Sequence, residues 1–238
     1  MAFQITKATP DDVPQLVDIY FAAFRDDLDL LIFPDTKSNR KWWSKSLRSD
    51  VSDPDVLVLK AVERVGDVET IVAWTLWELW DEEDLGAWSE SDSESDSGCS
   101  SSSDSDSETE SEEEFGEDET AAHGFYEMAW ETHSRFMKNP HWFLEIIATS
   151  PTHQRRGAGS LLLKHGLKKV DEMGLEAYTE ASPLAVPLYE KAGFRGDDRL
   201  EFKHKKSLYY HVAMVRSAKN CKEALPAVEE LALDEKEG

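Results

Sequence analysis

An almost wholly apolar run, Trp142–Ala148, leads into a loop with two glycines and then into a helix-forming segment. The run has the length of a buried strand, and we expect it to be covered on both faces. The loop is Gln154–Gly159, and the helix after it, with Leu163 on its apolar face, should end at Gly174. A short strand predicted at 177–181 completes a strand–loop–helix–strand unit. Because the two strands of such a unit run parallel, the chain should contain a parallel pair.

The rest of the chain predicts antiparallel pairing and further helices. Apolar β-rich runs at 56–62 and 70–80 flank Gly66-Asp67 and read as a hairpin. Further strands are predicted at 3–7, 201–202 and 209–215, and helices after Thr9, at 38–48, at 121–137 and before Gly193. One face of the third helix should carry Phe125, Met128, Ala129, Thr132, Phe136 and Met137. The predicted fold class is α+β, with a mixed, mostly antiparallel twisted sheet of six to seven strands and helices on both faces.

Charge divides the chain into two unlike parts. The formal net charge of the 238 residues is −23, yet 18 acidic residues and no Lys or Arg lie between Asp81 and Glu119. The other 199 residues hold 31 acidic and 26 basic side chains, which is an ordinary balance. The acidic segment is dominated by Ser, Asp and Glu and has too little apolar surface to offset the entropy of ordering it. We therefore predict one domain, 1–216, interrupted by a disordered insert at 81–120 and followed by a flexible tail at 217–238.

Composition also limits partners and compartment. Such an acidic chain is unsuited to binding nucleic acid through phosphates or to binding anionic membranes. The sequence shows neither a secretory signal at its start nor a run of 18 apolar residues. Cys99 and Cys221 have no CxxC or histidine spacing, so neither a zinc site nor a disulfide framework is expected. These features favour a cytoplasmic or nuclear protein.

The glycine loop has the chemistry of a phosphate site. A loop that opens a helix directs unpaired backbone N–H groups outward, and the helix dipole adds partial positive charge. Gly157 and Gly159 let a ligand approach the backbone, and Arg155 and Arg156 add cationic charge. The glycines fit neither GxGxxG nor a P-loop, so a pyrophosphate-bearing ligand of another kind is expected.

Gln154-Arg155-Arg156-Gly157-Ala158-Gly159 fits the pattern R/Q-x-x-G-x-G/A of the GCN5-related N-acetyltransferases, the GNAT superfamily, which the chain resembles. Glu180-Ala181-Ser182 and Leu188-Tyr189-Glu190-Lys191-Ala192-Gly193-Phe194 resemble its later strand and helix end. The resemblance covers about 3–80 and 121–216. The strand and loop at 142–151, Trp-Phe-Leu-x-x-x-Ala-Thr-x-Pro, resemble those of fungal members.

The resemblance implies acetyl-CoA as co-substrate, with no metal. The loop Gln154, Arg155, Arg156, Gly157, Ala158, Gly159 and Ser160 would hold the pyrophosphate. The backbone edge at Ile147, Ala148 and Thr149 would pair with the pantetheine arm, where the parallel strands splay apart. The N–H of Ile147 or Ala148 would stabilise the oxyanion.

Two residues are the catalytic candidates. Tyr189 corresponds to the superfamily's usual proton donor to the coenzyme sulfur; the alternative is a core tyrosine. Glu145 lies mid-strand, flanked on its own face by Phe143 and Ile147, where desolvation would raise its pKa towards that of a general base. It could instead pair with a basic residue, and Glu180 or a water chain could serve as the base.

The remaining candidates are aromatic and histidine residues. Most tryptophans should be core residues, with Trp42 or Trp43 facing the cleft. His141 is expected at the surface and His153 in a solvated loop; no pair of histidines shows ligand spacing.

The leading hypothesis is an acetyl-CoA-dependent N-acetyltransferase in which a primary amine attacks the thioester directly. The acceptor could be a small molecule or a protein lysine. The alternative is an acidic interaction protein that binds basic partners through residues 81–119 on a non-catalytic scaffold. A tolerated loop without any partner is the third possibility.

Overall fold

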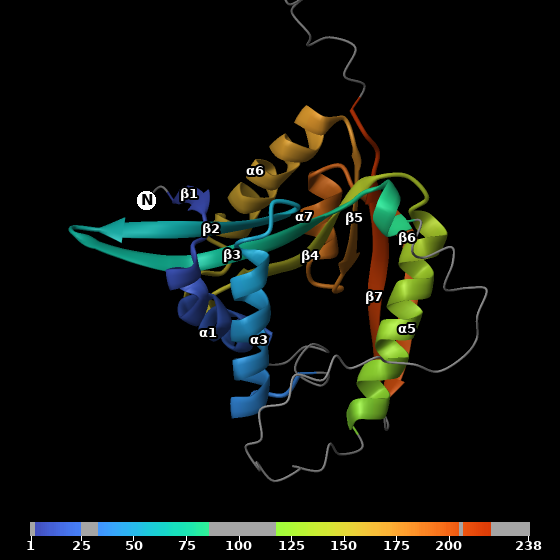
Figure 1. Cartoon of the computed structure of the whole chain (residues 1–238), viewed down its shortest axis with the longest axis horizontal. Helices are drawn as coiled ribbons and strands as arrows, with labels where there is room; N and C mark the ends of the chain where they lie inside the picture. Colours follow the sequence, from blue (N-terminus) through green and yellow to red (C-terminus); the bar gives the residue numbers. More distant parts are fainter. Residues whose placement is uncertain (1–2, 25–32, 86–117, 205–206, 220–238) are drawn as a thin grey trace, which may run out of the picture.

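The computed structural model describes residues 3–24, 33–85, 118–204 and 207–219, which form a seven-stranded sheet with helices on both faces (Figure 1). The strand order is β1-β2-β3-β4-β5-β7-β6, and among these described strands only the β4–β5 pair is parallel. The strands are β1 (Gln4–Lys7), β2 (Val56–Val65), β3 (Val68–Trp80), β4 (His141–Thr149), β5 (Glu176–Ala181), β6 (Arg195–His204) and β7 (Ser207–Arg216). The helices are η1 (Pro10–Asp12), α1 (Val13–Ala23), α3 (Lys37–Asp50), α5 (Asp118–Phe136), η2 (Pro151–His153), α6 (Ala158–Met173) and α7 (Val186–Lys191). The predicted α+β fold class with one parallel pair is confirmed.

Most of the predicted acidic insert, 86–117, and of the predicted tail, 220–238, lies outside the described residues. β3 ends at Trp80, as the sequence predicts, and α5 begins at Asp118, two residues before the predicted end of the insert. The predictions about disorder in these two segments therefore stay predictions.

Helices pack on both faces of the sheet, so the core has two layers. On one face α1 and α3 cover β2–β4 around Trp74 and Leu76, and α5 covers β5–β7 around Tyr178. On the other face α6 and α7 pack around Trp77, and Figure 1 shows α6 across the sheet from α1 and α3. A Cβ at Gly166 of α6 would lie 2.4 Å from the Trp77 ring, so only glycine fits this approach.

The parallel strands β4 and β5 separate soon after they begin to pair. Their register runs from His141 opposite Glu176 only to Phe143 opposite Tyr178. Both strands continue, β4 to Thr149 and β5 to Ala181. β4 stays paired with β3 along this stretch, so the predicted splay leaves the β5-facing edge of β4 outside the ladder beyond residue 143.

A β-bulge at Glu145 changes which way the end of β4 faces. Leu76 of β3 pairs with Ile146 and the next residue, Trp77, pairs with Leu144, which leaves Glu145 as the extra residue. Ile146 packs with the α1–α3 layer, whereas Ile147 packs with the α6–α7 layer. The expectation that Ile147 shares a face with Glu145 is therefore wrong, because the bulge interrupts the alternation. The expectation of full cover is also wrong, since Glu145 is exposed.

The buried face of α5 differs from the predicted one at its C-terminal end. Phe136 is 39% exposed, and Met137, which is buried, follows the end of the helix. His133 is buried on this helix, and its Nε2 lies 2.7 Å from Nε2 of His141. His141 is fully buried rather than at the surface, because β4 begins at this residue and α5 covers it.

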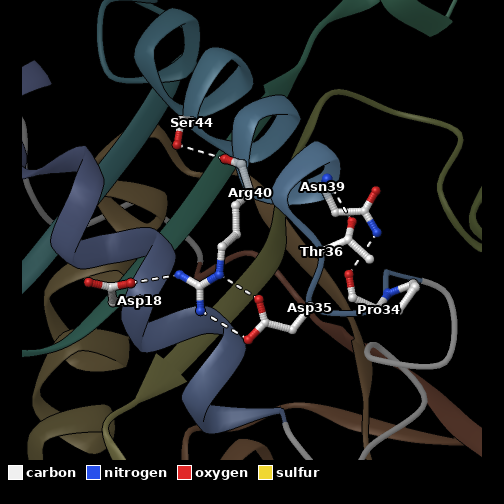
Figure 2. Close-up of polar contacts among 7 residues, drawn as sticks. All are labelled: Asp18, Pro34, Asp35, Thr36, Asn39, Arg40 and Ser44. Carbon is white, nitrogen blue, oxygen red and sulfur yellow. Dashed lines mark hydrogen bonds and ion pairs between the residues drawn. The ribbon is translucent and has the colours of Figure 1, made fainter. Parts of the chain in front are cut away.

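Arg40 ties the two helices of the first layer to the segment that precedes α3 (Figure 2). Its guanidinium donates to Asp18 of α1 at 2.7 Å and to both carboxylate oxygens of Asp35. The segment so held includes Phe33, whose ring stacks on Trp42 with centroids 5.3 Å apart. The ion pairs thus fix an aromatic wall beside β3 and β4.

Candidate active site

The loop before α6 has an unusual backbone path. Arg155 has φ +61° and Gly157 has φ +93°, both in the left-handed region, and α6 begins directly afterwards. Gly157 occupies the N-cap position of α6 and has no side chain to cap the helix, so no capping side chain accepts from the first-turn N–H groups. The Gln154 side chain donates to the Thr149 carbonyl at 3.3 Å, which joins the loop to the end of β4. The predicted residues 154–160 are thus brought together around a concentration of N–H donors.

Gly159 lies where the first turn of α6 meets the end of β4. A Cβ at this residue would lie 3.5 Å from Cδ1 of Ile147 and 3.6 Å from Oγ1 of Thr149. The first turn of the helix therefore lies against the part of β4 that has left the parallel ladder. The structure places the predicted loop and the predicted backbone edge side by side.

Arg156 has a structural partner. Its guanidinium pairs with Glu63 of β2, and Nε2 of His153 lies 3.2 Å from the same carboxylate. Burial alone would raise the pKa of Glu63, but these partners hold that pKa below its ordinary value. Arg156 and His153 thus anchor the loop to β2, a role that the sequence did not predict for either residue.

A groove of about 820 Å³ lies between α6 and α7 and begins at Ser160. We call it the α6–α7 groove, and its basic lining comprises Lys164, His165, Lys168, Lys191, Arg216 and Lys219. Arg216 and Lys219 both bind Asp171 at 2.7 Å. Lys164 and Lys191 are exposed, and no carboxylate in the described part of the chain pairs with them. The groove can therefore neutralise an anion that extends from the loop.

Tyr189 lies on α7, at the same face of the sheet as this groove. The side chain is 3% exposed, and its ring meets that of Phe194 at a centroid distance of 5.6 Å. It belongs to the apolar cluster that includes Ala181, the last residue of β5, and that Ile147 borders. Tyr189 is thus a core residue beside the two separated strands, so the core and catalytic readings are compatible.

On the opposite face lies a cavity of about 440 Å³, bounded by α3, α5 and β3–β5. We call it the aromatic cavity, because its lining includes Tyr20, Phe33, Trp42, Trp43, Trp80, Phe125, Tyr126, Trp130 and Phe143. Both Trp42 and Trp43 line it, where one was expected, while Trp74 and Trp77 are fully buried core residues as predicted. Four carboxylates also line it, those of Asp50, Glu78, Glu145 and Glu180. Among the described residues of the lining, none is Lys or Arg.

Glu180 is the carboxylate whose protonation is most altered. Burial raises its pKa to about 7, although the hydroxyl of Tyr178 donates to it at 3.1 Å and works in the opposite direction. Burial also raises the pKa of Tyr178, so this hydroxyl keeps its proton. Glu180 therefore exists in both protonation states near neutral pH, as a general base requires.

His133 packs against Tyr178, the residue that donates to Glu180, and His141 contacts His133. The His133 ring is parallel to that of Tyr178, with centroids 4.5 Å apart. Nδ1 of His141 donates to the Asn139 carbonyl at 2.8 Å, so its Nε2 accepts from Nε2 of His133. Burial and the neighbouring His141 lower the pKa of His133 to about 3, so the ring is neutral and acts as packing.

Glu145 lines the same cavity at the bulge, but it is exposed rather than desolvated. The burial that the sequence argument assumed at mid-strand is found at Glu180, which was the alternative. Both carboxylates lie on the strand segments that follow the last β4–β5 pair.

A model of the acetyltransferase (GNAT) family matches residues 73–194, from within β3 to three residues after the end of α7. The chain belongs to the GNAT family. Acetyl transfer is the general chemistry of this family, and the matched range holds the splayed strands, the loop, Glu180 and Tyr189. The resemblance inferred from the sequence is thus confirmed.

Solved structures share the fold of this GNAT protein at low sequence identity. A Drosophila melanogaster polyamine N-acetyltransferase that forms N-acetylagmatine is 12% identical, with a TM-score of 0.59 over 91% of this chain and 100% of that one. A histone acetyltransferase HPA2 and related acetyltransferase from Corynebacterium glutamicum is 20% identical, with a TM-score of 0.54 over 96% and 100%. A phosphinothricin acetyltransferase from Sinorhizobium meliloti, in complex with acetyl-CoA, is 11% identical, with a TM-score of 0.57 over 96% and 95%.

Four residues of this GNAT protein's two recesses were missed from the sequence: Lys164, Lys191, Asp50 and Glu78. Glu78 could have been found, because a carboxylate within the tryptophan-rich strand calls for the same reasoning that singled out Glu145. The other three carry no local signal. Within the described ranges no three His, Cys, Asp or Glu side chains are grouped to hold a metal ion, and no helix has the length and apolar character to cross a membrane.

Proposed function

We propose that this protein transfers an acetyl group from acetyl-CoA to a primary amine, which attacks the thioester directly. The observation that carries the proposal is the opening of β4 and β5 between two unlike recesses. The basic groove lies on one face and the acidic aromatic cavity on the other. An anionic donor and a cationic acceptor can therefore approach the same gap from opposite sides.

The donor side supports this assignment through its backbone. N–H groups of the loop and of the first turn of α6, Gln154 to Ser160, would hold the pyrophosphate. Lys164 and Lys191 would neutralise the remaining phosphate charge. The edge of β4 at Ile147, Ala148 and Thr149 would pair with the pantetheine amides, since β5 has turned away there. Bound in this way, the coenzyme supplies an activated acetyl group.

The acid and base lie on opposite faces of the same opening. We assign Glu180 as the base that removes a proton from the acceptor ammonium, in preference to Glu145 or a water chain, because its pKa is about 7. The amine nitrogen then forms a bond to the acetyl carbon, the carbon–sulfur bond breaks, and the nitrogen releases its second proton to water. Tyr189 donates a proton to the departing thiolate and takes a proton back from water. The cited D. melanogaster enzyme acts on an amine, which agrees with this choice of acceptor.

Acetyl-CoA should protect the protein against thermal unfolding. At a ligand concentration of about 100 times Kd the free energy of unfolding rises by about 2.7 kcal/mol, which corresponds to several degrees in Tm. Differential scanning fluorimetry with acetyl-CoA measures this, and adenosine serves as the uncharged control. An unchanged Tm at saturating acetyl-CoA would refute the proposal.

Tyr189→Phe should lower kcat about 100-fold and leave the Kd for acetyl-CoA unchanged. The substitution removes one hydroxyl from a closely packed ring and keeps the contact with Phe194. Coenzyme A release, followed with a thiol reagent, gives kcat, and calorimetry gives Kd. Wild-type turnover in this variant would leave Tyr189 as a core residue only.

A further inference from the structure

The aromatic cavity has more negative charge than proton abstraction from one amine requires. Asp50 accepts a weak hydrogen bond from Ser46 at 3.4 Å, and Glu78 accepts one from the Trp80 indole at 2.9 Å. Neither carboxylate pairs with a Lys or Arg in the part of the chain that the structure describes. Burial raises the pKa of both, and the two repel each other. Such a pair is stabilised by a cation that enters the cavity.

The pair lies at a distance from the reacting end of the cavity. Glu78 is opposite Phe143, which is opposite Tyr178, so one row crosses β3, β4 and β5. Glu180 is two residues beyond Tyr178 and points to the same face. With strands about 4.8 Å apart and a rise of about 3.3 Å per residue, the Cα atoms of Glu78 and Glu180 are roughly 12 Å apart. The cavity therefore has two separate anionic ends.

The last turn of α3 adds to the remote end. α3 ends at Asp50, so its carbonyl-rich C-terminus, with partial negative charge, lies beside the same carboxylate. A cation is favoured there, and an anion is not.

The walls of the cavity are largely aromatic. Trp42 stacks on Phe33, and Trp43 meets Tyr20 at a centroid distance of 4.4 Å. Trp43 is 5% exposed, and its indole N–H has no hydrogen-bond partner among the described residues. Aromatic faces suit both an alkyl chain and an ammonium group.

We propose that the acceptor is an elongated diamine or polyamine whose reacting nitrogen lies at Glu180 and whose second ammonium is bound by Asp50 and Glu78. This inference rests on the proposed acetyl transfer and names its substrate class. An aromatic monoamine would fill the same walls but would leave the remote carboxylates without a counter-ion, which makes it the main competing outcome.

A matched pair of probes isolates the second charge. α,ω-Diaminooctane and octylamine have the same chain and differ by one terminal ammonium. With the wild type at pH 8, kcat/KM for the diamine should exceed that for octylamine about 10- to 100-fold. α,ω-Diaminobutane should show much less preference over butylamine, because its second ammonium falls short of Glu78. A ratio near one for the octane pair, in an enzyme that acetylates both, would overturn the inference and leave the proposed function intact.

Charge-removing variants locate the binding site. In the Asp50→Asn/Glu78→Gln double variant the octane ratio should fall to about one, while kcat/KM for octylamine stays the same or rises. Glu69→Gln, a surface carboxylate paired with Arg64 at the far end of the β2–β3 hairpin, is the control and should keep the wild-type ratio. Equal loss on both amines would show a merely structural role and overturn the inference. If the double variant does not fold, the single variants give the same comparison.

Binding separates this inference from the proposed function. If no amine is acetylated, α,ω-diaminooctane is titrated into the protein by calorimetry. Binding that weakens at least about tenfold in the double variant supports the diamine site and counts against catalysis. Absence of binding in the wild type would overturn the diamine site itself.

Discussion

Compared across the sheet, the two recesses differ in charge and in what they are made of. The α6–α7 groove has five Lys or Arg side chains against Asp171 and Glu172, and it continues into a loop of backbone N–H donors. The aromatic cavity has four carboxylates and, among its described lining residues, neither Lys nor Arg. The two substrates of a transfer reaction can therefore be sorted by charge before they meet, with the sheet between them.

The comparison also separates fixed parts from variable ones. The donor side depends on main-chain geometry at Gly157, whose positive φ few substitutions leave intact. The acceptor side depends on side chains of α3, α5 and three strands, each of which can change without disturbing the backbone. Substrate choice in this protein should thus be easier to alter than coenzyme choice.

Glu180→Gln should have the largest effect on the acceptor side, lowering kcat about 10²- to 10⁴-fold. The same change should stabilise the protein at high pH. The folded pKa of about 7 lies above the ordinary value of 4.5, so the folded state binds more protons between these values and stability falls as pH rises. At pH 8 the variant should gain about 2–3 kcal/mol in the free energy of unfolding, and below pH 4 little or nothing.

Urea unfolding at both pH values and coenzyme A release measure the two effects. Glu176→Gln, on the same strand but outside the cavity lining, is the matched control and should change neither. If the Glu180→Gln variant keeps the wild-type kcat, Glu180 is not the general base, and Glu145 or a water chain takes that role.

The double variant Lys164→Gln/Lys191→Gln should break the donor side alone. Two exposed ion pairs of up to about 1 kcal/mol each would raise the Kd for acetyl-CoA roughly tenfold and weaken its salt dependence. KM for the amine should not change, because both lysines lie across the sheet from the cavity. Lys169→Gln, also exposed on α6 but outside the groove lining, is the control. Equal effects on both substrates would contradict the separation of the two recesses.

The sequence predicts the donor side better than the acceptor side, because the donor side is built from local main-chain geometry and the acceptor side from side chains of several elements. The loop, its helix and the parallel pair are local or depend on glycines whose conformation the sequence dictates, and all three were predicted. The bulge at Glu145 arises from the register between β3 and β4, which are far apart in the chain, so no local pattern shows it. The approach of Asp50 to Glu78 and of His133 to His141 likewise depends on how α3 and α5 pack.

The same limit explains the choice between two carboxylates. Glu145 and Glu180 are both carboxylates on apolar strands, and the sequence favours Glu145 because its neighbours are more hydrophobic. Burial in the folded protein is decided by what covers each strand. The bulge leaves Glu145 exposed, whereas Glu180 is partly buried under α5 and beside Tyr178.

Tyr178→Phe is the finest test of the acceptor side, because it leaves every carboxylate in place. The hydroxyl favours the ionised form of Glu180, so its removal should raise the pKa of that carboxyl further. A hydrogen bond of about 1 kcal/mol corresponds to about 0.7 pH units. The midpoint of the acidic limb of kcat/KM should move from about pH 7 upward by that amount, with about threefold lower activity at pH 7. Above pH 9 variant and wild type should agree, since Glu180 is then ionised in both, whereas damage to packing under His133 would lower activity at every pH.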